Sequence, residues 1–425
     1  MKKQRNNLKI GVLGLWHLGC VYATGLVKLG YEMEASDPDT KIVKNLQQGK
    51  PPIFEPGMEE IINKNNNKFL NFVDLKQLFK NKDYIFISYD LPVDENDRVK
   101  TKLIDKTIKL ISKYGEEKTV YVVSSQIPLG TCKQIAKAAK NVIYFPENVR
   151  LGKAYETFLT PDRIILGSNI PALMYKFEKD FKIFNCPFLK MSWESAEMVK
   201  HALNAYLATC VSYSSEISDL CELLGANMMD VVSALKSDRR VSPFAPINPG
   251  MGFAGATLGR DIKNLKYLGL EKNYKTKLFN IVYKVNQERL DWLIKKIVKN
   301  AGKLKGLNIG ILGLTYKPGT NTLRRSMSLE LADKLHRAGA IVRAFDPVIK
   351  ENIETHKFIN IVSNETDFFK DLEAAVLMTE WPEFKEVKVE RAGKMMKKKI
   401  IFDTKNFLDK NDYLENMFLY IGTGI

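Results

Sequence analysis

Residues 8–19 read LKIGVLGLWHLG, and residues 307–319 read LNIGILGLTYKPG. In each stretch an apolar strand pattern breaks at a glycine, and after the first one a helical pattern follows through YATGLVKLG. A strand, a glycine turn and a helix in this order begin a doubly wound α/β domain, whose ligand crevice lies at the carboxyl ends of its strands. The two starts, about 300 residues apart, therefore predict an α/β chain with two doubly wound, Rossmann-like domains.

The first glycine turn has most features of a dinucleotide-binding site. The next strand pattern, YEMEASD, ends in Asp37 roughly 20 residues after the turn, where such folds place the carboxylate that accepts hydrogen bonds from the adenosine ribose. The cofactor diphosphate lies at the helix N-terminus. The fingerprint GxGxxG reads GLWHLG here, so Trp16 replaces the glycine that lets the backbone approach the diphosphate. Its side chain has to point away from the cofactor, or the cofactor binds in a shifted pose.

Two interpretations of this turn are open, a dinucleotide site and a plain structural turn. Because Asp37 is in place, we favour the first. The cofactor is then NAD, since the charge of Asp37 would repel the 2′-phosphate of NADP. The predicted cofactor-binding residues are Gly14, Trp16, His17, Leu18, Gly19, Asp37 and Lys41.

A long helix is predicted over residues 194–225, where apolar residues recur at helical spacing without a proline and Gly225 offers a stop. About 30 residues exceed what one domain normally needs. We therefore predict that this central helix joins the two α/β units and offers a face for a homodimer. Lys200 and Asn204 are four residues apart in it, and thus on one face. They are either a solvated pair or part of a site.

Length and composition bound the class of protein. A chain of 425 residues with 45% hydrophobic and 27% charged residues predicts two or three globular domains. No apolar run approaches the roughly 20 residues of a membrane span, and the N-terminus MKKQRNN leads directly into a strand pattern. We predict a cytoplasmic protein that contacts no membrane. The five cysteines have no CxxC spacing, which predicts reduced, mostly buried thiols and no metal site.

The formal net charge of +16 raises the question of a nucleic-acid partner. The lysines are spread along the chain, and no recognisable nucleic-acid module accompanies them. We therefore predict no nucleic-acid binding. The charge is either a solvated basic surface or a means of attracting small molecules that carry phosphate.

Residues 249–261, PGMGFAGATLGRD, form a loop with three glycines in its first seven positions. Glycines at this density let a backbone adopt positive φ and approach a ligand closely. Thr257 lies where a nucleophile would face that ligand. A threonine hydroxyl is far harder to ionise than a cysteine thiol, and the sequence offers no obvious histidine as its base. We favour a hydroxyl that hydrogen-bonds substrate or water.

Assembled in order, these segments resemble the nucleotide-sugar 6-dehydrogenase family over nearly the whole chain. This family comprises the UDP-glucose, UDP-N-acetyl-hexosamine and GDP-mannose dehydrogenases. The other matching motifs are NLQQGKPPIFEPGMEEII (45–62), SSQIPLGT (124–131), FPENVRLGKA (145–154), PDRIILG (161–167), GLTYKPGTNTLRRS (313–326), FDP (345–347), TEWPEF (379–384) and FDTKN (402–406). The resemblance implies oxidation of the C6 alcohol of a nucleotide sugar to a carboxylate in two NAD-dependent hydride transfers. A cysteine holds the intermediate in the family, first as a thiohemiacetal and then as a thioester, and Thr257 stands in its place.

The resemblance also implies roles for individual residues. Lys200 and Asn204 match the residues that polarise the reacting oxygen, and Asp261 matches the aspartate that helps to activate a water. The predicted catalytic residues are Lys200, Asn204, Asp261, Thr257, Glu147 and Gln126, the last standing where the family has a threonine. The predicted substrate-binding residues are Arg240, which matches an arginine that reaches the site across the dimer, and Phe253, Gly255, Lys317 and Arg324. Arg260 replaces a family lysine, and NT at 321–322 replaces a pair of aspartates.

Three hypotheses about function follow. The first is NAD-dependent oxidation of a nucleotide sugar, most simply a UDP-hexose, that stops at the aldehyde or reaches the acid through a noncovalent hydrate. The second is a different redox reaction on a related anionic substrate, and the third is a noncatalytic homologue that binds a nucleotide sugar or a partner enzyme. The predicted domains are an NAD-binding domain at 1–194, a central helical dimerisation domain at 195–295 and a UDP-sugar-binding domain at 296–425.

Overall fold

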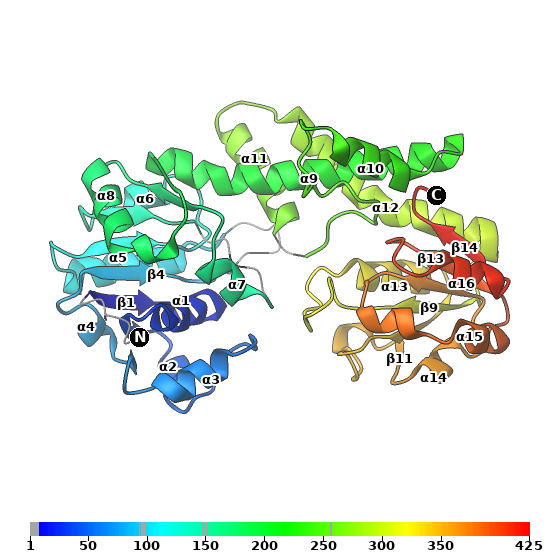
Figure 1. Ribbon diagram of the computed structural model, residues 1–425, viewed down its shortest axis with the longest axis horizontal. Helices are drawn as coiled ribbons and strands as arrows, with labels where there is room; N and C mark the ends of the chain where they lie inside the picture. Colours follow the sequence, from blue (N-terminus) through cyan, green and yellow to red (C-terminus); the bar gives the residue numbers. More distant parts are fainter. Residues whose placement is uncertain (1–7, 93, 95–98, 147–148, 150–151, 256) are drawn as a thin grey trace. The chain divides into compact units, whose positions relative to one another are not determined.

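The computed structural model describes residues 8–92, 94, 99–146, 149, 152–255 and 257–425 (Figure 1). The chain divides into two compact units, Met1–Ala202 and Leu203–Ile425, and the boundary falls inside one long helix. Each unit contains one sheet.

The first unit is built on an eight-stranded sheet with the order β3-β2-β1-β4-β5-β6-β7-β8. Neighbouring strands run parallel, except that β6 and β7 pair antiparallel. The central strands are short apolar runs such as YIFI and VYVV that are buried throughout, as parallel strands between helix layers must be. The strands are β1 (Lys9–Leu13), β2 (Glu32–Ser36), β3 (Leu70–Phe72), β4 (Tyr84–Ile87), β5 (Val120–Val123), β6 (Val142–Tyr144), β7 (Ile164–Gly167) and β8 (Phe188–Met191).

The predicted strand-turn-helix start is confirmed, because α1 follows β1 directly after the glycine turn. The helices of this unit are α1 (His17–Lys28), α2 (Thr40–Gln47), α3 (Met58–Asn65), α4 (Leu75–Leu78), α5 (Lys102–Tyr114), α6 (Thr131–Ile135), α7 (Ala154–Leu159) and α8 (Pro171–Asp180), with a 3₁₀ turn at Lys182–Phe184.

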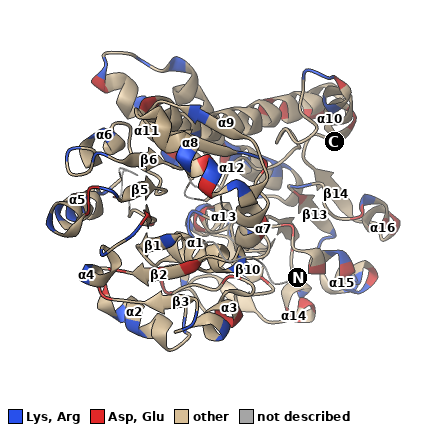
Figure 2. Cartoon of the chain, turned by 60° about the vertical axis from the view of Figure 1, so that its left-hand side comes forward, with Lys and Arg blue, Asp and Glu red and all other residues tan. Residues whose placement is uncertain are grey.

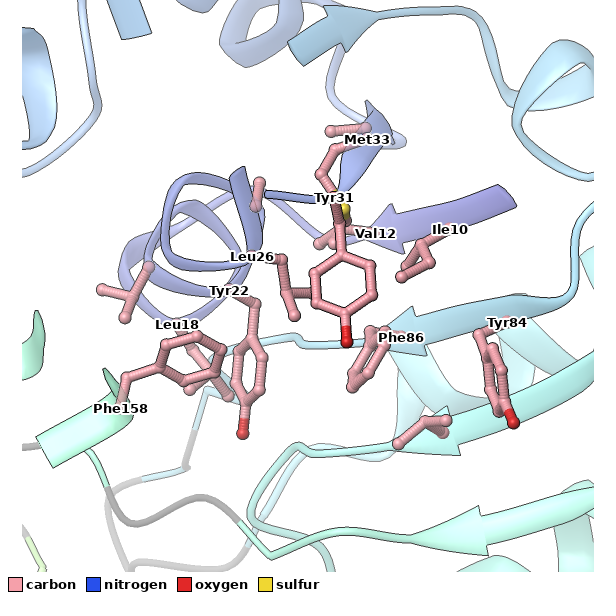
Figure 3. Close-up of a cluster of buried hydrophobic side chains, with 14 of the residues drawn as sticks. Ile10, Val12, Leu18, Tyr22, Leu26, Tyr31, Met33, Tyr84, Phe86 and Phe158 are labelled. Carbon is pink, nitrogen blue, oxygen red and sulfur yellow. The ribbon is translucent and has the colours of Figure 1, made fainter. Parts of the chain in front are cut away.

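Aromatic side chains pack α1 against the sheet (Figure 3). Tyr22 of α1 lies edge-on to Phe158 of α7, with ring centroids 4.9 Å apart, and its ring is 5.7 Å from that of Phe86 on β4. Gly25, one turn further along α1, leaves room for the Phe158 ring, since a Cβ there would lie 2.5 Å from that ring. This packing holds the N-terminus of α1 at the end of β1, where the first glycine turn lies.

The predicted long helix is confirmed as α9 (Trp193–Leu224), 32 residues without a break. It ends where the sequence predicts, at Gly225, whose φ of 73° is left-handed and costs glycine little.

The second unit carries a six-stranded, fully parallel sheet with the order β11-β10-β9-β12-β13-β14. This order repeats that of the first six strands of the first sheet, so both predicted Rossmann-like domains are present. The strands are β9 (Asn308–Leu312), β10 (Ile341–Phe345), β11 (Asn360–Val362), β12 (Ala374–Leu377), β13 (Ile400–Asp403) and β14 (Leu419–Gly422). The helices are α10 (Met228–Ser237), α11 (Leu258–Glu271), α12 (Lys277–Ala301), α13 (Met327–Arg337), α14 (Glu365–Phe369), α15 (Val389–Met395) and α16 (Lys410–Glu415), with 3₁₀ turns at Glu354–His356 and Pro382–Glu386.

Basic residues are distributed over both units. Figure 2 shows Lys and Arg beside Asp and Glu on several helices, α5, α8 and α15 among them. Within the described ranges, no helix is long and apolar enough to cross a membrane. All five cysteines are free thiols, of which Cys20, Cys132 and Cys221 are buried, while the other two are partly exposed.

Candidate active site

The first glycine turn forms a hydrogen-bonded frame at the carboxyl end of β1. Gly14 has a φ of 95°, and its N–H donates to the Ser36 carbonyl at 3.0 Å. The next N–H, of Leu15, donates to Asp37 Oδ2 at 2.7 Å, and Asp37 Oδ1 accepts the Asp39 N–H at 2.7 Å. Asp37 is half-buried, and this burial raises the pKa of its carboxyl against the opposing effect of the two N–H donors. A carboxylate accepts about four hydrogen bonds, so Asp37 retains acceptor capacity for ribose hydroxyls.

The two glycine positions that the sequence shares with the fingerprint are sterically required. A Cβ on Gly19 would lie 1.6 Å from the Gly14 carbonyl oxygen, so only glycine lets α1 approach the turn this closely. A Cβ on Gly14 would lie 2.7 Å from the Tyr89 ring. Trp16, by contrast, has an ordinary φ of −85°, and its side chain is 45% exposed. The backbone at position 16 therefore does not need glycine, and the indole extends to solvent.

Two carboxylates that the sequence did not single out hold the start of α1. His17 Nε2 lies 3.0 Å from Oε2 of Glu55, which is buried and also accepts the N–H groups of Gly152 (3.0 Å) and Ala154 (2.9 Å). The Leu18 N–H donates to Asp90 Oδ2 at 3.2 Å. Glu55 belongs to the FEPG motif, which was a usable signal, but nothing in the sequence pointed to Asp90.

A polar stripe runs along the first half of α9. Glu197, Lys200, His201 and Asn204 follow the spacing i, i+3, i+4, i+7 and therefore share one face of the helix. Glu197 is fully buried and accepts the backbone N–H groups of Gly130 (2.6 Å) and Cys132 (2.9 Å), while His201 Nε2 lies 3.3 Å from the Ile127 carbonyl. These contacts hold the loop after β5 that contains the predicted catalytic residue Gln126. Burial raises the pKa of the Glu197 carboxyl.

The next turn of the stripe brings two predicted catalytic residues together. Asn204 Nδ2 donates a short hydrogen bond to Asp261 Oδ2, and both side chains are buried. Arg260 Nε lies 4.0 Å from the other carboxylate oxygen of Asp261. Asp261 thus fixes the Asn204 amide in one orientation, and the second N–H of this amide stays available as a donor.

Thr257 is exposed at the N-cap position of α11, and its side chain caps no backbone N–H. The Asp261 N–H donates to the Thr257 carbonyl at 3.1 Å, so the two residues are one helical turn apart on the same face. A threonine hydroxyl in this place can hydrogen-bond a ligand, but a carboxylate already engaged by Asn204 is a weak base for ionising it.

The glycine-rich loop before Thr257 is fixed by α12 and by the second glycine turn. The Phe253 N–H donates to Asn286 Oδ1 at 2.7 Å, and Asn286 Nδ2 donates back to the Phe253 carbonyl at 3.1 Å. The Gly255 N–H donates to the Arg325 carbonyl at 3.1 Å, and a Cβ on Gly255 would lie 3.1 Å from the Tyr316 ring. The loop therefore holds Phe253 and Gly255 in fixed positions.

The remaining predicted site residues are more dispersed. Arg240 is exposed and binds Asp238 with two hydrogen bonds (2.9 and 2.7 Å), so its side chain is held within its own loop. Lys317 Nζ lies 5.6 Å from the centroid of the Tyr316 ring, and Arg324 is exposed in the same segment. Lys41 is exposed at the start of α2, where its N–H is capped by Asp39. Glu147 lies outside the described residues.

The second glycine turn repeats the backbone hydrogen bond of the first, but its aspartate has different contacts. The Gly313 N–H donates to the Phe345 carbonyl at 2.9 Å, as Gly14 donates to Ser36. Asp346, the counterpart of Asp37, is fully buried and accepts four backbone N–H groups, those of Leu314, Thr315, Val348 and Ile349. With its acceptor capacity used, Asp346 is a structural carboxylate.

Fold and site together define a class of protein. A long helix joins a Rossmann domain with a dinucleotide-type turn to a second Rossmann-like domain, and this helix contains the Lys200–Asn204 pair. The first turn fits NAD, because it combines a glycine-packed α1 N-terminus with a half-exposed carboxylate. This is the arrangement of a dinucleotide-binding protein with a second Rossmann-like domain.

Comparison with known sequences identifies the family. Three sequence models of the UDP-glucose/GDP-mannose dehydrogenase family match the chain: the NAD binding domain at residues 8–185, the central domain at 194–288 and the UDP binding domain at 310–410. A UDP-glucose 6-dehydrogenase of Rickettsia prowazekii is 31% identical over 98% of this chain and 99% of its own length. One from Bacillus subtilis is 28% identical over 98% of this chain and 93% of its own length. The chain belongs to the UDP-glucose/GDP-mannose dehydrogenase family, a family of NAD-dependent nucleotide-sugar dehydrogenases.

Solved structures agree with this assignment. A UDP-glucose dehydrogenase from Pyrobaculum islandicum matches with a TM-score of 0.88 and 25% identity, over 100% of this chain and 99% of that one. A UDP-D-ManNAc dehydrogenase from Pyrococcus horikoshii has the same fold, with a TM-score of 0.84 over 98% of this chain and 99% of that one at 22% identity. The three family segments are near the predicted domains, whose boundaries at 194/195 and 295/296 stay predictions.

Proposed function

We propose that this protein oxidises the C6 hydroxyl of a UDP-hexose with NAD and releases mainly the aldehyde. The observation that carries the proposal is the buried Asn204–Asp261 pair one helical turn from Thr257. We infer that Thr257 stands at the position of the family's cysteine. The groups for one alcohol oxidation are retained, while the group that would trap its product is absent.

The residues divide the chemistry as follows. NAD supplies the hydride acceptor when it is bound at the first glycine turn. Lys200 and the Asn204 amide polarise the reacting oxygen, and a water or basic group beside them takes its proton. Asp261 acts through Asn204 by fixing the direction of its amide. Glu197 and His201 keep the Gln126 loop attached to the same face of α9.

Thr257 decides the product. Without a thiolate the aldehyde forms no thioester, so a second oxidation requires the aldehyde hydrate and is slower. Thr257→Cys should raise the proportion of uronic acid among the products at least several-fold, because a thiol is partly ionised near neutral pH. Thr257→Ser, which keeps a hydroxyl, is the matched control. An unchanged product ratio in the cysteine variant would contradict this role of Thr257.

The activity itself is tested by NADH absorbance with a panel of UDP- and GDP-sugars. Lys200→Ala should lower kcat by about 100-fold or more, in the range of a lost acid–base group. Lys284→Ala removes an exposed lysine of α12 and should leave kcat unchanged. A nucleotide sugar that raises the melting temperature without any NADH formation would instead support the noncatalytic binding hypothesis, and turnover of another anionic substrate alone would support the second hypothesis.

We also propose a homodimer formed through α9. Its outer face has apolar residues at alternating spacings of four and three, as in a helix-pairing seam. Tyr206, Tyr213, Leu220 and Leu224 of this seam are exposed, and Cys210 and Ile217 between them are partly exposed. Leu220→Asp should convert the dimer to a monomer in light scattering, whereas Glu194→Ala, at an exposed position in the first turn of α9, should not. A monomeric wild-type protein would refute the dimer.

A further inference from the structure

The start of α1 has three backbone donors for a ligand. In an α-helix the first N–H groups have no acceptor within the helix, and here these belong to His17, Leu18 and Gly19, since the Cys20 N–H already donates to the Trp16 carbonyl at 3.0 Å. Such donors, together with the positive end of the helix dipole, attract an anion. The proposed NAD site depends on them, because the cofactor diphosphate binds at this helix N-terminus.

One of the three donors is already occupied by a negative charge. Asp90 follows β4, the neighbour of β1 in the sheet, and its Oδ2 accepts the Leu18 N–H at 3.2 Å. Asp90 is exposed, so water could solvate its carboxylate in place of the Leu18 N–H. Burial raises the pKa of the Cys20 thiol in the first turn of α1, and the charge of Asp90 raises it further, which agrees with a carboxylate placed over this turn.

A carboxylate and a diphosphate cannot share this position. Both are acceptors for the same N–H, and like charges a few ångströms apart repel each other. We propose that Asp90 limits the NAD affinity of this protein by competing with the cofactor diphosphate for the Leu18 N–H, so that binding requires the Asp90 side chain to turn away. This inference rests on the proposed NAD site at the first turn and concerns a residue that no sequence motif singles out.

The test is the dissociation constant of NAD, measured by calorimetry on the full-length protein. Asp90→Asn removes the charge but keeps an oxygen that can cap the helix, because Asn and Asp are equally good caps. It should bind NAD roughly tenfold more tightly than wild type, equivalent to about 1.4 kcal/mol. Raising the salt concentration should reduce the difference, because ions screen the repulsion. Asp105→Asn removes the same charge from an exposed position on α5 and should leave the affinity unchanged.

The outcomes separate a competing carboxylate from a helix cap. If Asp90→Asn and Asp90→Ala bind NAD no more tightly than wild type while wild type binds it, Asp90 is only a cap and the inference is overturned. A lower melting temperature of Asp90→Ala without tighter binding leads to the same conclusion. If neither the wild type nor either Asp90 variant binds NAD, both this inference and the proposed cofactor site fail.

Discussion

The turns after β1 and β9 share one backbone hydrogen-bond pattern, but their aspartates differ in burial and in the number of hydrogen bonds that they accept. In each, a glycine with positive φ follows the strand, donates to the end of the neighbouring strand, and is followed by an N–H that binds an aspartate. Asp37 is half-buried and accepts two backbone N–H groups, whereas Asp346 is fully buried and accepts four. The frame is thus common to both domains, and of the two carboxylates Asp37 is the one that retains acceptor capacity for a ligand.

The helix after each turn differs as well. In the first unit α1 begins at His17, so its N-terminal N–H groups lie at the turn. In the second unit α13 begins only at Met327, and its N-cap Ser326 already caps the Ser328 N–H at 3.2 Å. The segment between holds Lys317 and Arg324. The second turn is therefore followed by a segment with cationic side chains, whereas the first is followed directly by the backbone donors of α1.

The largest expected effect separates the two aspartates by stability. Asp346→Asn should lower the free energy of unfolding by about 3 kcal/mol, because an amide N–H₂ would face backbone donors in a buried site. Asp37→Asn should cost less than about 1 kcal/mol, since solvent reaches this side chain. The unfolding midpoints in urea measure both. Equal losses in the two variants would show that the carboxylates are equivalent.

The second prediction separates two positions of the first turn. Gly19→Ala should destabilise the protein by roughly 1 to 3 kcal/mol, because its Cβ would overlap the Gly14 carbonyl. Trp16→Ala, at an exposed position with an ordinary φ, should change stability by less than about 0.5 kcal/mol. Thermal melting of both variants is the measurement, and an intolerant position 16 would contradict the structure of this turn.

The third and smallest effect is a pH dependence specific to the first turn. We expect NAD binding to use ionised Asp37, and burial raises the pKa of this carboxyl. The NAD affinity should therefore fall on acidification from a higher pH than an ordinary aspartate would give. The raised pKa of Asp37 affects folding stability in the opposite direction from NAD affinity. Its contribution to the free energy of unfolding is largest below the unfolded-state pKa and is lost as the pH rises through the raised folded-state pKa.

Calorimetric titrations with NAD across the acidic range test this prediction. Asp37→Asn should bind more weakly and remove the Asp37 contribution to the pH dependence. A variant whose affinity follows the same pH profile as the wild type would assign that dependence to another group.

Much of the fold could be predicted from local patterns, and the site only in part. The apolar runs, the two glycine turns and the helix that ends at Gly225 are signals within a few residues, and the structure confirms them. The contacts of Glu197 with Gly130 and of Asp90 with Leu18 join residues more than 60 positions apart. They depend on which strands become neighbours, and the sequence does not encode that locally. The four backbone hydrogen bonds that Asp346 accepts could not be predicted from the sequence for the same reason, although the FDP motif itself is recognisable.

We propose that the chain retains the groups for one hydride transfer and lacks the nucleophile that links it to a second. The direct measurement counts NADH formed per UDP-hexose consumed, in the presence of an aldehyde-trapping amine, and identifies the products by mass spectrometry. We expect about one NADH per sugar and a trapped aldehyde as the main product. Two NADH per sugar with free uronic acid and no trapped aldehyde, or no NADH with any UDP- or GDP-sugar, would contradict it.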